Sequence, residues 1–177
     1  AYNVAVGASA GLSVTTGVRN TLIGALAGDA LTDADNNVAI GYNALSSDTL
    51  GTASIAIGES ALLAQNFTTA TNAYNVAIGT GAGAGISTGT FNTLMGGLAG
   101  DALTDADYNV AMGYQALTQD TLGSLSVAIG GFALSAQNNT TATNTFNVGI
   151  GYAAGAAVTT GTQNTFIGAL SGDAVTD

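Results

Sequence analysis

Residues Asn75-Val76-Ala77-Ile78-Gly79 form one copy of a five-residue phrase that recurs along the whole chain. Each copy opens with Asn or Ser and closes with Gly, and the copies begin at Asn3, Asn20, Asn37, Ser54, Asn75, Asn92, Asn109, Ser126, Asn147 and Asn164. A 17-residue step separates successive copies, except that a 21-residue step follows Ser54 and Ser126. A short fixed period of this kind indicates a solenoid, in which every repeat is one coil stacked on the next.

The coils also follow a larger order, because three of the shorter steps and one longer step make a 72-residue unit. A coils start at residues 3, 75 and 147, B coils at 20, 92 and 164, C coils at 37 and 109, and D coils at 54 and 126. We number positions within a coil from its opening Asn or Ser, so Gly79 stands at position 5. The sequence predicts an all-β parallel β-solenoid of the β-roll type, continuous over residues 1–177 without a domain boundary.

The composition excludes several functional classes. Charged residues make up 7% of the chain, against about 25% in ordinary globular proteins. Arg19 is the single basic residue and there are eleven acidic residues, which gives a formal net charge of −10. One basic residue is too few for nucleic acid or an anionic membrane to be the expected partner. No apolar run reaches the roughly 18 residues of a membrane span. Cys and His are absent, which excludes thiol- or His-based catalysis and disulfides, and we expect no enzyme activity.

Each phrase reads as a short β-strand with alternating faces. Val76 and Ile78 are two residues apart and share one face, which we expect to point inward, whereas Ala77 points the other way and leaves room for another backbone. In the B coils this outer position holds the bulky residues Leu22, Leu94 and Phe166, which would suit a partner surface. The small residue at position 8 and the residue after it predict a second short strand. With 47% hydrophobic residues and a mean hydropathy of +0.39, the outer faces are expected to be buried against sister chains.

Two columns of residues repeat in phase. The opening Asn residues are expected to stack into a side-chain amide ladder and to cap the turns; they are Asn3, Asn20, Asn37, Asn75, Asn92, Asn109, Asn147 and Asn164. The closing Gly residues are expected to supply a positive φ or a close backbone approach; they are Gly7, Gly24, Gly41, Gly58, Gly79, Gly96, Gly113, Gly130, Gly151 and Gly168. We interpret both columns as requirements of the fold rather than as binding sites.

The acidic stretches of the B coils are candidate Ca²⁺ sites, since carboxylates are the hard oxygen ligands that Ca²⁺ prefers. The candidate ligands are Asp29, Asp33 and Asp35 in the first repeat and Asp101, Asp105 and Asp107 in the second. Their spacing matches neither the EF-hand loop nor the glycine-rich calcium nonapeptide. The alternative, a solvated acidic turn that keeps a fibre soluble, is favoured, and no other cofactor is expected.

The additional residues of the D coils predict loops at 64–74 and 136–146 that project on one side of the solenoid. These loops contain acceptor patterns for N-glycosylation at Asn66, Asn138 and Asn139. Such patterns also arise by chance in segments rich in Asn and Thr, and that interpretation is favoured. Ice binding is disfavoured, because Thr21, Thr93 and Thr165 recur in the B coils alone.

The segment Asn37-Val38-Ala39-Ile40-Gly41-Tyr42-Asn43-Ala44-Leu45 resembles repeat arrays of bacterial surface proteins and phage tail fibres, and the ten phrases resemble the YadA-like head repeats of trimeric autotransporter adhesins. The resemblance covers the whole chain. It implies a left-handed β-roll, a homotrimer, and a place in an extracellular, cell-surface or virion tail fibre.

Two classes of function remain open at this stage. The first is a structural filament segment that assembles with copies of itself, as a homotrimer and end to end, and acts as a mechanical spacer. The second is an adhesin or phage receptor-binding fibre that contacts a host receptor or surface glycan through the loops at 64–74 and 136–146. Faithful repetition favours the first class, and the incomplete repeats at both ends suggest a piece of a longer fibre.

Overall fold

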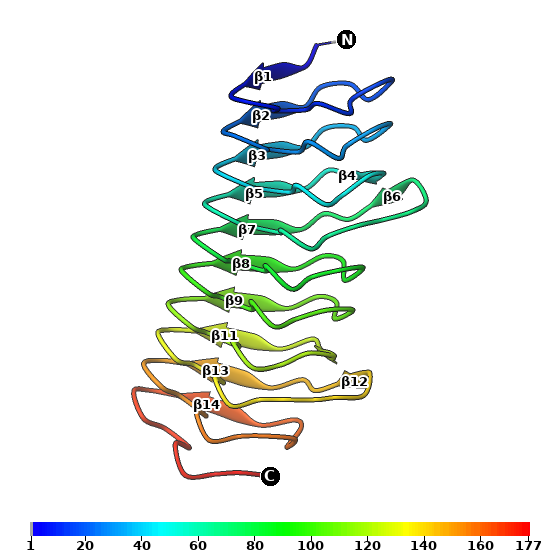
Figure 1. The fold of residues 1–177 in the computed structure, drawn as a ribbon. Coiled ribbons are helices and arrows are strands. Elements are labelled where there is room, and N and C mark those ends of the chain that lie inside the picture. The colour runs from blue at the N-terminus through cyan, green and yellow to red at the C-terminus, as the bar shows by residue number, and fades with distance from the viewer. Residues whose placement is uncertain (1) are drawn as a thin grey trace.

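The computed structural model describes residues 2–177 and shows a β-solenoid of about ten coils without helices in that range. One strand of each coil joins a single ten-stranded parallel sheet that runs the length of the molecule (Figure 1). In spatial order these strands are β1 (Val4–Val6), β2 (Thr21–Ile23), β3 (Val38–Ile40), β5 (Ile55–Ile57), β7 (Val76–Ile78), β8 (Thr93–Met95), β9 (Val110–Met112), β11 (Val127–Ile129), β13 (Val148–Ile150) and β14 (Thr165–Ile167). The predicted fold class is confirmed.

The strands pair in the register that the sequence period requires. Between β7 and β8, for example, Val76 lies opposite Thr93, Ala77 opposite Leu94 and Ile78 opposite Met95. The D coils keep this register despite their additional residues, because the insertion loops out beyond the stack. Two small parallel pairs form there, β4 (Gly51–Thr52) with β6 (Thr71–Asn72) and β10 (Gly123–Ser124) with β12 (Thr143–Asn144). Figure 1 shows the chain that carries β6 extending past the coils on either side.

The two strand faces are arranged in the opposite way to the one predicted. The residues at position 3 point inward and are fully buried, as Ala39, Ala56, Ala77, Ala111 and Ala128 show. Their Val and Ile neighbours at positions 2 and 4 lie on the outside and stay partly exposed. The expectation that Leu22 and Leu94 face a partner is also wrong, since both side chains are 0% exposed in the core. The physical reason is the narrow interior of a 17-residue coil, which has room for a methyl group at most strands.

In the core of the B, C and D coils, a large side chain on one side of the coil lies opposite a small residue on the other side. In B coils the strand supplies Leu94, and the turn opposite it carries Gly100, where a Cβ atom would lie 2.9 Å from Leu94 Cδ2. In C and D coils the strand supplies Ala, and the turn supplies the buried residues Leu45, Leu62, Leu117 and Leu134. Position 12 holds an aliphatic residue, such as Leu31 or Ile86, in the A and B coils, which are the coils whose turn carries Gly. One or two large side chains therefore fill each coil.

A second strand after the closing Gly is not formed. The segment is a turn instead, in which the Ala44 N–H donates to the carbonyl of Gly41 at 3.4 Å. Left-handed φ values at Gly41 (139°), Asn43 (56°) and Leu45 (53°) alternate with ordinary ones. This alternation turns the chain through a corner and prevents an extended segment.

The closing Gly residues are required by the distance between coils. Gly79 has φ 139°, and a Cβ atom placed on it would lie 2.5 Å from the carbonyl oxygen of Gly96 in the next coil. No side chain fits at that separation. The repeated phrase therefore ends in Gly because the corners of adjacent coils nearly touch there.

Candidate functional site

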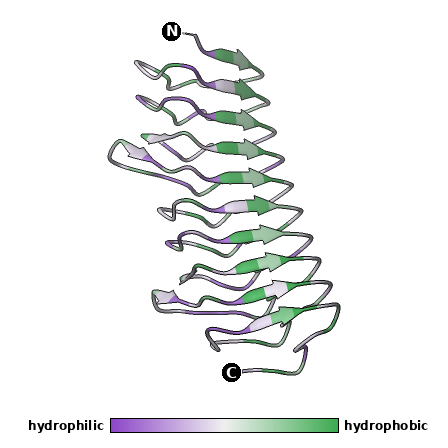
Figure 2. Ribbon diagram, turned by 180° about the vertical axis from the view of Figure 1, so that it is seen from behind, coloured by the Kyte–Doolittle hydropathy of each residue, from purple (hydrophilic) through white to green (hydrophobic). Residues whose placement is uncertain are grey.

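One surface runs the length of the solenoid: the outer face of the ten-stranded sheet, which we call the outer sheet face. It consists of the residues at positions 2 and 4 of every coil, which are the first and last residues of each strand, and none of these residues is charged. Figure 2 shows hydrophobic colouring along the strands from one end of the solenoid to the other. Neighbouring strands shield one another, so Ile23 and Met95, which have a strand on each side, are 37% exposed, whereas Ile167 on the last strand is 69% exposed. A partly exposed, uncharged and mainly apolar surface of this length is typical of a protein–protein contact.

The Asn column stacks in phase, but its hydrogen bonds run mainly between side chain and backbone. Asn92 shows the pattern: its Nδ2 donates to the carbonyl of Ala106 in the same coil at 2.7 Å, and its Oδ1 accepts from the N–H of Asn109 in the next coil at 3.0 Å. Direct contacts between amides are longer, as between Asn92 Nδ2 and Asn75 Oδ1 at 3.3 Å. The interior members of the column are buried, so each of these bonds satisfies a backbone group that water does not reach.

A second column, which the sequence analysis missed, occupies position 13. It contains Thr15, Thr32, Thr49, Asn66, Ser87, Thr104, Thr121, Asn138, Thr159 and Thr176. Most of the hydroxyl groups donate to the backbone carbonyl of the next coil; Thr104 Oγ1, for example, lies 3.0 Å from the carbonyl of Thr121. The sequence does carry a signal for this column, because position 13 is Thr in seven of the ten coils. Because these hydroxyls are used between coils, the column holds the corners of the stack together.

A polar cluster is buried inside the solenoid where a C coil meets a D coil. Asp48 stands at position 12, which is aliphatic in the A and B coils, and it is fully buried together with Gln65 of the next coil. Gln65 Nε2 donates to Asp48 Oδ2 at 2.6 Å and to Ser54 Oγ at 3.0 Å, and Gln65 Oε1 accepts from Asn75 Nδ2 at 2.9 Å. The second repeat forms the same cluster from Asp120, Gln137, Ser126 and Asn147.

The carboxylate of Asp48 serves backbone groups beside the D-coil insertion. Its Oδ1 accepts from the N–H groups of Gly51 and Phe67, both at 3.0 Å. The additional residues of the D coil interrupt the regular pairing there, so a side chain takes the place of a neighbouring carbonyl. Burial raises the pKa of the Asp48 carboxyl above its ordinary value, and the hydrogen bonds from Gln65 and Phe67 offset that rise in part. Asp48 and Gln65 stand at the same position of successive coils, so only the stacking of coils brings them together.

The candidate calcium ligands are not brought together into a cation site. Within residues 2–177 no group of three or more carboxylates lies close enough to hold a metal ion. Each repeat spreads its Asp residues along the edge of a coil, where most accept a hydrogen bond from the preceding coil. Asp33 and Asp105 accept from the hydroxyl groups of Thr16 and Thr88, at 2.6 and 2.7 Å. Asp35 and Asp107 accept from the backbone N–H groups of Val18 and Thr90. Asp101 accepts from Thr118 Oγ1 at 2.6 Å, whereas its equivalent Asp29 has a buried Oδ1 without a partner in the described residues.

The D-coil loops differ in how they present the glycosylation patterns. Asn66 and Asn138 are exposed, but Asn139 is 5% exposed and its Nδ2 atom is buried without a hydrogen-bond partner among the described residues. Asn139 stands where the first repeat has Phe67, whose ring fills the same place at 6% exposure. Asn139 is therefore packed under its loop and is not accessible for modification.

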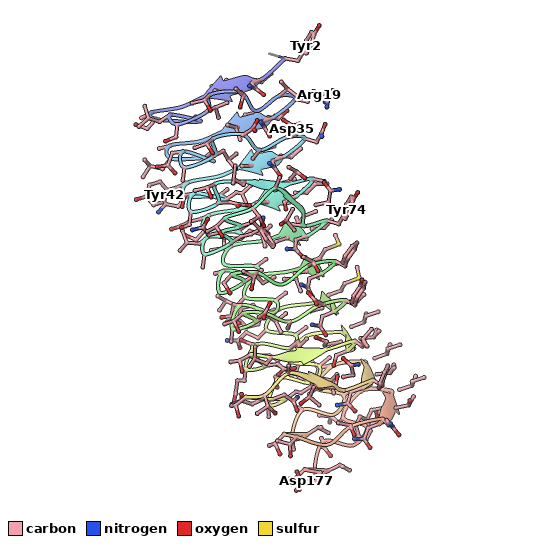
Figure 3. The ribbon with its side chains drawn as sticks, turned by 90° about the vertical axis from the view of Figure 1, so that its right-hand side faces the viewer. Tyr2, Arg19, Asp35, Tyr42, Tyr74 and Asp177 are labelled. Atoms are coloured by element: carbon pink, nitrogen blue, oxygen red, sulfur yellow. The ribbon has the colours of Figure 1, made fainter. Side chains whose placement is uncertain are left out.

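Aromatic side chains form two further groups outside the core. Tyr74, Phe91 and Tyr108 immediately precede the phrases at 75, 92 and 109 and stack with ring centroids 5.3 and 4.8 Å apart. Tyr114, Phe132 and Tyr152 make edge-to-face contacts at 5.5 and 5.9 Å. Figure 3 shows Tyr74 and Tyr42 on opposite sides of the solenoid. Stacking along the coil axis explains why exposed aromatic residues recur in phase.

Comparison of the chain with family models, with curated proteins and with solved structures gives no match. The described residues also contain no helix long and apolar enough to cross a membrane.

Proposed function

We propose that the chain is a structural segment of an extracellular fibre, in which copies associate side by side through the outer sheet face as a homotrimer. The observation that supports this proposal is the uncharged surface on all ten strands of the sheet, which is apolar except at Thr21, Thr93 and Thr165. A chain that functions alone in water gains nothing from two outward Val, Ile, Met or Thr residues on every coil, whereas copies that pack together remove that surface from water.

The shape of the outer sheet face suits a mechanical role. Ten coils at about 4.8 Å and strands of about 10 Å give a face of roughly 480 Å². A standard interface buries about 800 Å² on each partner, so copies of this length associate weakly and longer arrays associate more strongly. The contact area therefore grows with the number of coils, as a filament requires.

Sedimentation equilibrium over a range of protein concentrations up to the millimolar range tests the proposal. We expect the average mass to rise toward three times 17.1 kDa as the concentration increases. The variant Val76→Lys/Ile78→Lys places two charges at the middle of the face and should remain monomeric. Tyr42→Lys, on another side of the solenoid, is the matched control and should associate like the wild type. A wild-type chain that stays monomeric throughout this concentration range would contradict the proposal.

A further inference from the structure

We propose that a hollow lined in part by Tyr108 binds a neutral pyranose sugar unit. The hollow has a volume of about 270 Å³ and is lined by Asp107, Tyr108, Ser124, Leu125 and Asn144. It belongs to the edge of the second B and C coils and to the D-coil strand β12. The proposal does not depend on the association of copies through the outer sheet face.

The apolar wall of the hollow is created by the end of an aromatic stack. The Phe91 and Tyr108 rings are nearly parallel, with an interplanar angle of 2° and centroids 4.8 Å apart, so Phe91 covers one face of the Tyr108 ring. The next residue in that column is Leu125, which is not aromatic and does not continue the stack. Tyr108 and Leu125 both line the hollow, at the point where this column changes from aromatic rings to an aliphatic side chain.

The polar wall combines an anchored carboxylate with an exposed amide. Asp107 is anchored because its Oδ1 accepts from the N–H and Oγ1 of Thr90 at 2.6 and 2.9 Å, while its own N–H donates to Ser124 Oγ at 2.9 Å. The pairing of β10 with β12 sets Ser124 directly beside Asn144. Asp107 Oδ2 and the Asn144 amide are not used in hydrogen bonds within residues 2–177, so one carboxylate oxygen and one amide remain available to a ligand.

These groups match the two surfaces of a pyranose. Its C–H groups form an apolar face that packs on an aromatic ring, and its hydroxyls form a polar rim that donates to a carboxylate and exchanges hydrogen bonds with an amide. The Asp107 carboxylate and the absence of any basic residue in the lining exclude phosphate and acidic sugars. The volume lies near the lower limit of about 300–1,000 Å³ for small-molecule sites, which fits one sugar unit.

The first repeat provides an internal comparison. The equivalent positions hold Asp35, Asn36, Thr52, Ala53 and Asn72, so the aromatic ring and the Leu side chain are both missing. The amide is also engaged there, because Thr52 Oγ1 donates to Asn72 Oδ1 at 2.6 Å. Two repeats that are otherwise similar thus differ at the residues that form the hollow.

Saturation-transfer difference NMR on the whole chain tests this site, with D-glucose, D-galactose and N-acetyl-D-glucosamine as probes. We expect transfer to the ring protons of at least one probe, and at least a tenfold loss of affinity in Tyr108→Asn, which installs the side chain of the first repeat. Tyr74→Asn removes an aromatic residue from the same column away from the hollow and should bind like the wild type.

A second variant guards against a folding effect of the first. Asp107→Asn retains an oxygen for Thr90 and should weaken binding while the circular dichroism spectrum stays unchanged. Absence of transfer to all three probes would overturn the proposal, and so would equal binding by wild type, Tyr108→Asn and Asp107→Asn. The association experiment on the outer sheet face is scored separately, so either proposal can fail without the other.

Discussion

The side-chain amide of Gln65 donates to the carboxylate of Asp48 at 2.6 Å inside the solenoid, in a column that the A and B coils fill with aliphatic residues. The pair lies where a 21-residue coil follows a 17-residue coil. Its carboxylate accepts two backbone N–H groups that the longer coil leaves without a regular partner. The buried carboxyl group thus allows a coil of different length within a uniform stack.

Replacing Asp48 by Ala should destabilise the protein by about 3 kcal/mol, because two buried N–H groups and the Gln65 amide lose their acceptor. Urea unfolding followed by circular dichroism measures this change. Asp33→Ala, at an exposed carboxylate, is the control and should change the free energy of unfolding by less than about 0.5 kcal/mol. Equal effects of the two substitutions would show that the buried cluster is not important for stability.

Acidification should favour the folded state through Asp48. Since burial raises the pKa of this carboxyl in the folded protein, the folded state binds more protons than the unfolded state between the ordinary and the raised pKa. The contribution of Asp48 to stability is therefore complete below its ordinary pKa and is lost as the pH rises through the raised one. We expect the difference in unfolding free energy between wild type and Asp48→Asn to move in favour of the wild type as the pH falls from neutral toward the ordinary carboxyl pKa. A difference independent of pH would contradict this assignment.

Substituting Gly79 by Ala should lower the unfolding free energy by more than about 3 kcal/mol. The added methyl group would lie 2.5 Å from the carbonyl oxygen of Gly96, and the backbone φ of 139° is itself unfavourable for Ala. Gly168 has φ 120° but nothing within 4 Å of a Cβ atom. Gly168→Ala therefore isolates the backbone strain and should cost less. Thermal unfolding of both variants measures the difference, and equal losses would mean that close contact between coils is not what requires Gly.

Replacing Asn92 by Ala should lower the unfolding free energy by roughly 2–4 kcal/mol, because the carbonyl of Ala106 and the N–H of Asn109 are both left buried without a partner. Asn3 is exposed at the first coil, so water can replace its bonds and Asn3→Ala should cost about 1 kcal/mol or less. Hydrogen exchange of the Asn109 amide provides a local readout. Retained protection of that amide in Asn92→Ala would argue against the assigned bond.

The sequence predicted the coil boundaries, the parallel register and the Gly column, because each depends on a period that survives from coil to coil. It did not predict which strand face lies inside. Alternation separates Val76 and Ile78 from Ala77, but it does not say which side is the interior. Assigning the larger residues to the core follows ordinary globular proteins. In these 17-residue coils the interior holds Ala at most strands, and the B coils place Leu22 and Leu94 there.

The buried cluster and the hollow were missed for a related reason. Asp48 and Gln65 look like two isolated polar residues until position 12 is compared across coils, where Leu31 and Ile86 show it to be a core position. The hollow is visible only as a departure from repetition, with Tyr108 in place of Asn36. Averaging the repeats reveals the architecture, whereas the differences between them locate candidate sites.

The hydrogen bonds of the Asn column give the molecule a direction of growth. Coils that open with Asn and precede another coil offer the Asn Oδ1 to the first N–H of that coil, and their Nδ2 donates to a carbonyl of their own coil, as Asn75 shows with Asn92 and Gly89. At position 13, Thr hydroxyls likewise extend from one coil to the carbonyl of the next. A nascent chain leaving the ribosome therefore meets a finished template of acceptors and donors each time it completes a coil. Folding can advance coil by coil at the pace of synthesis, without waiting for the C-terminal end.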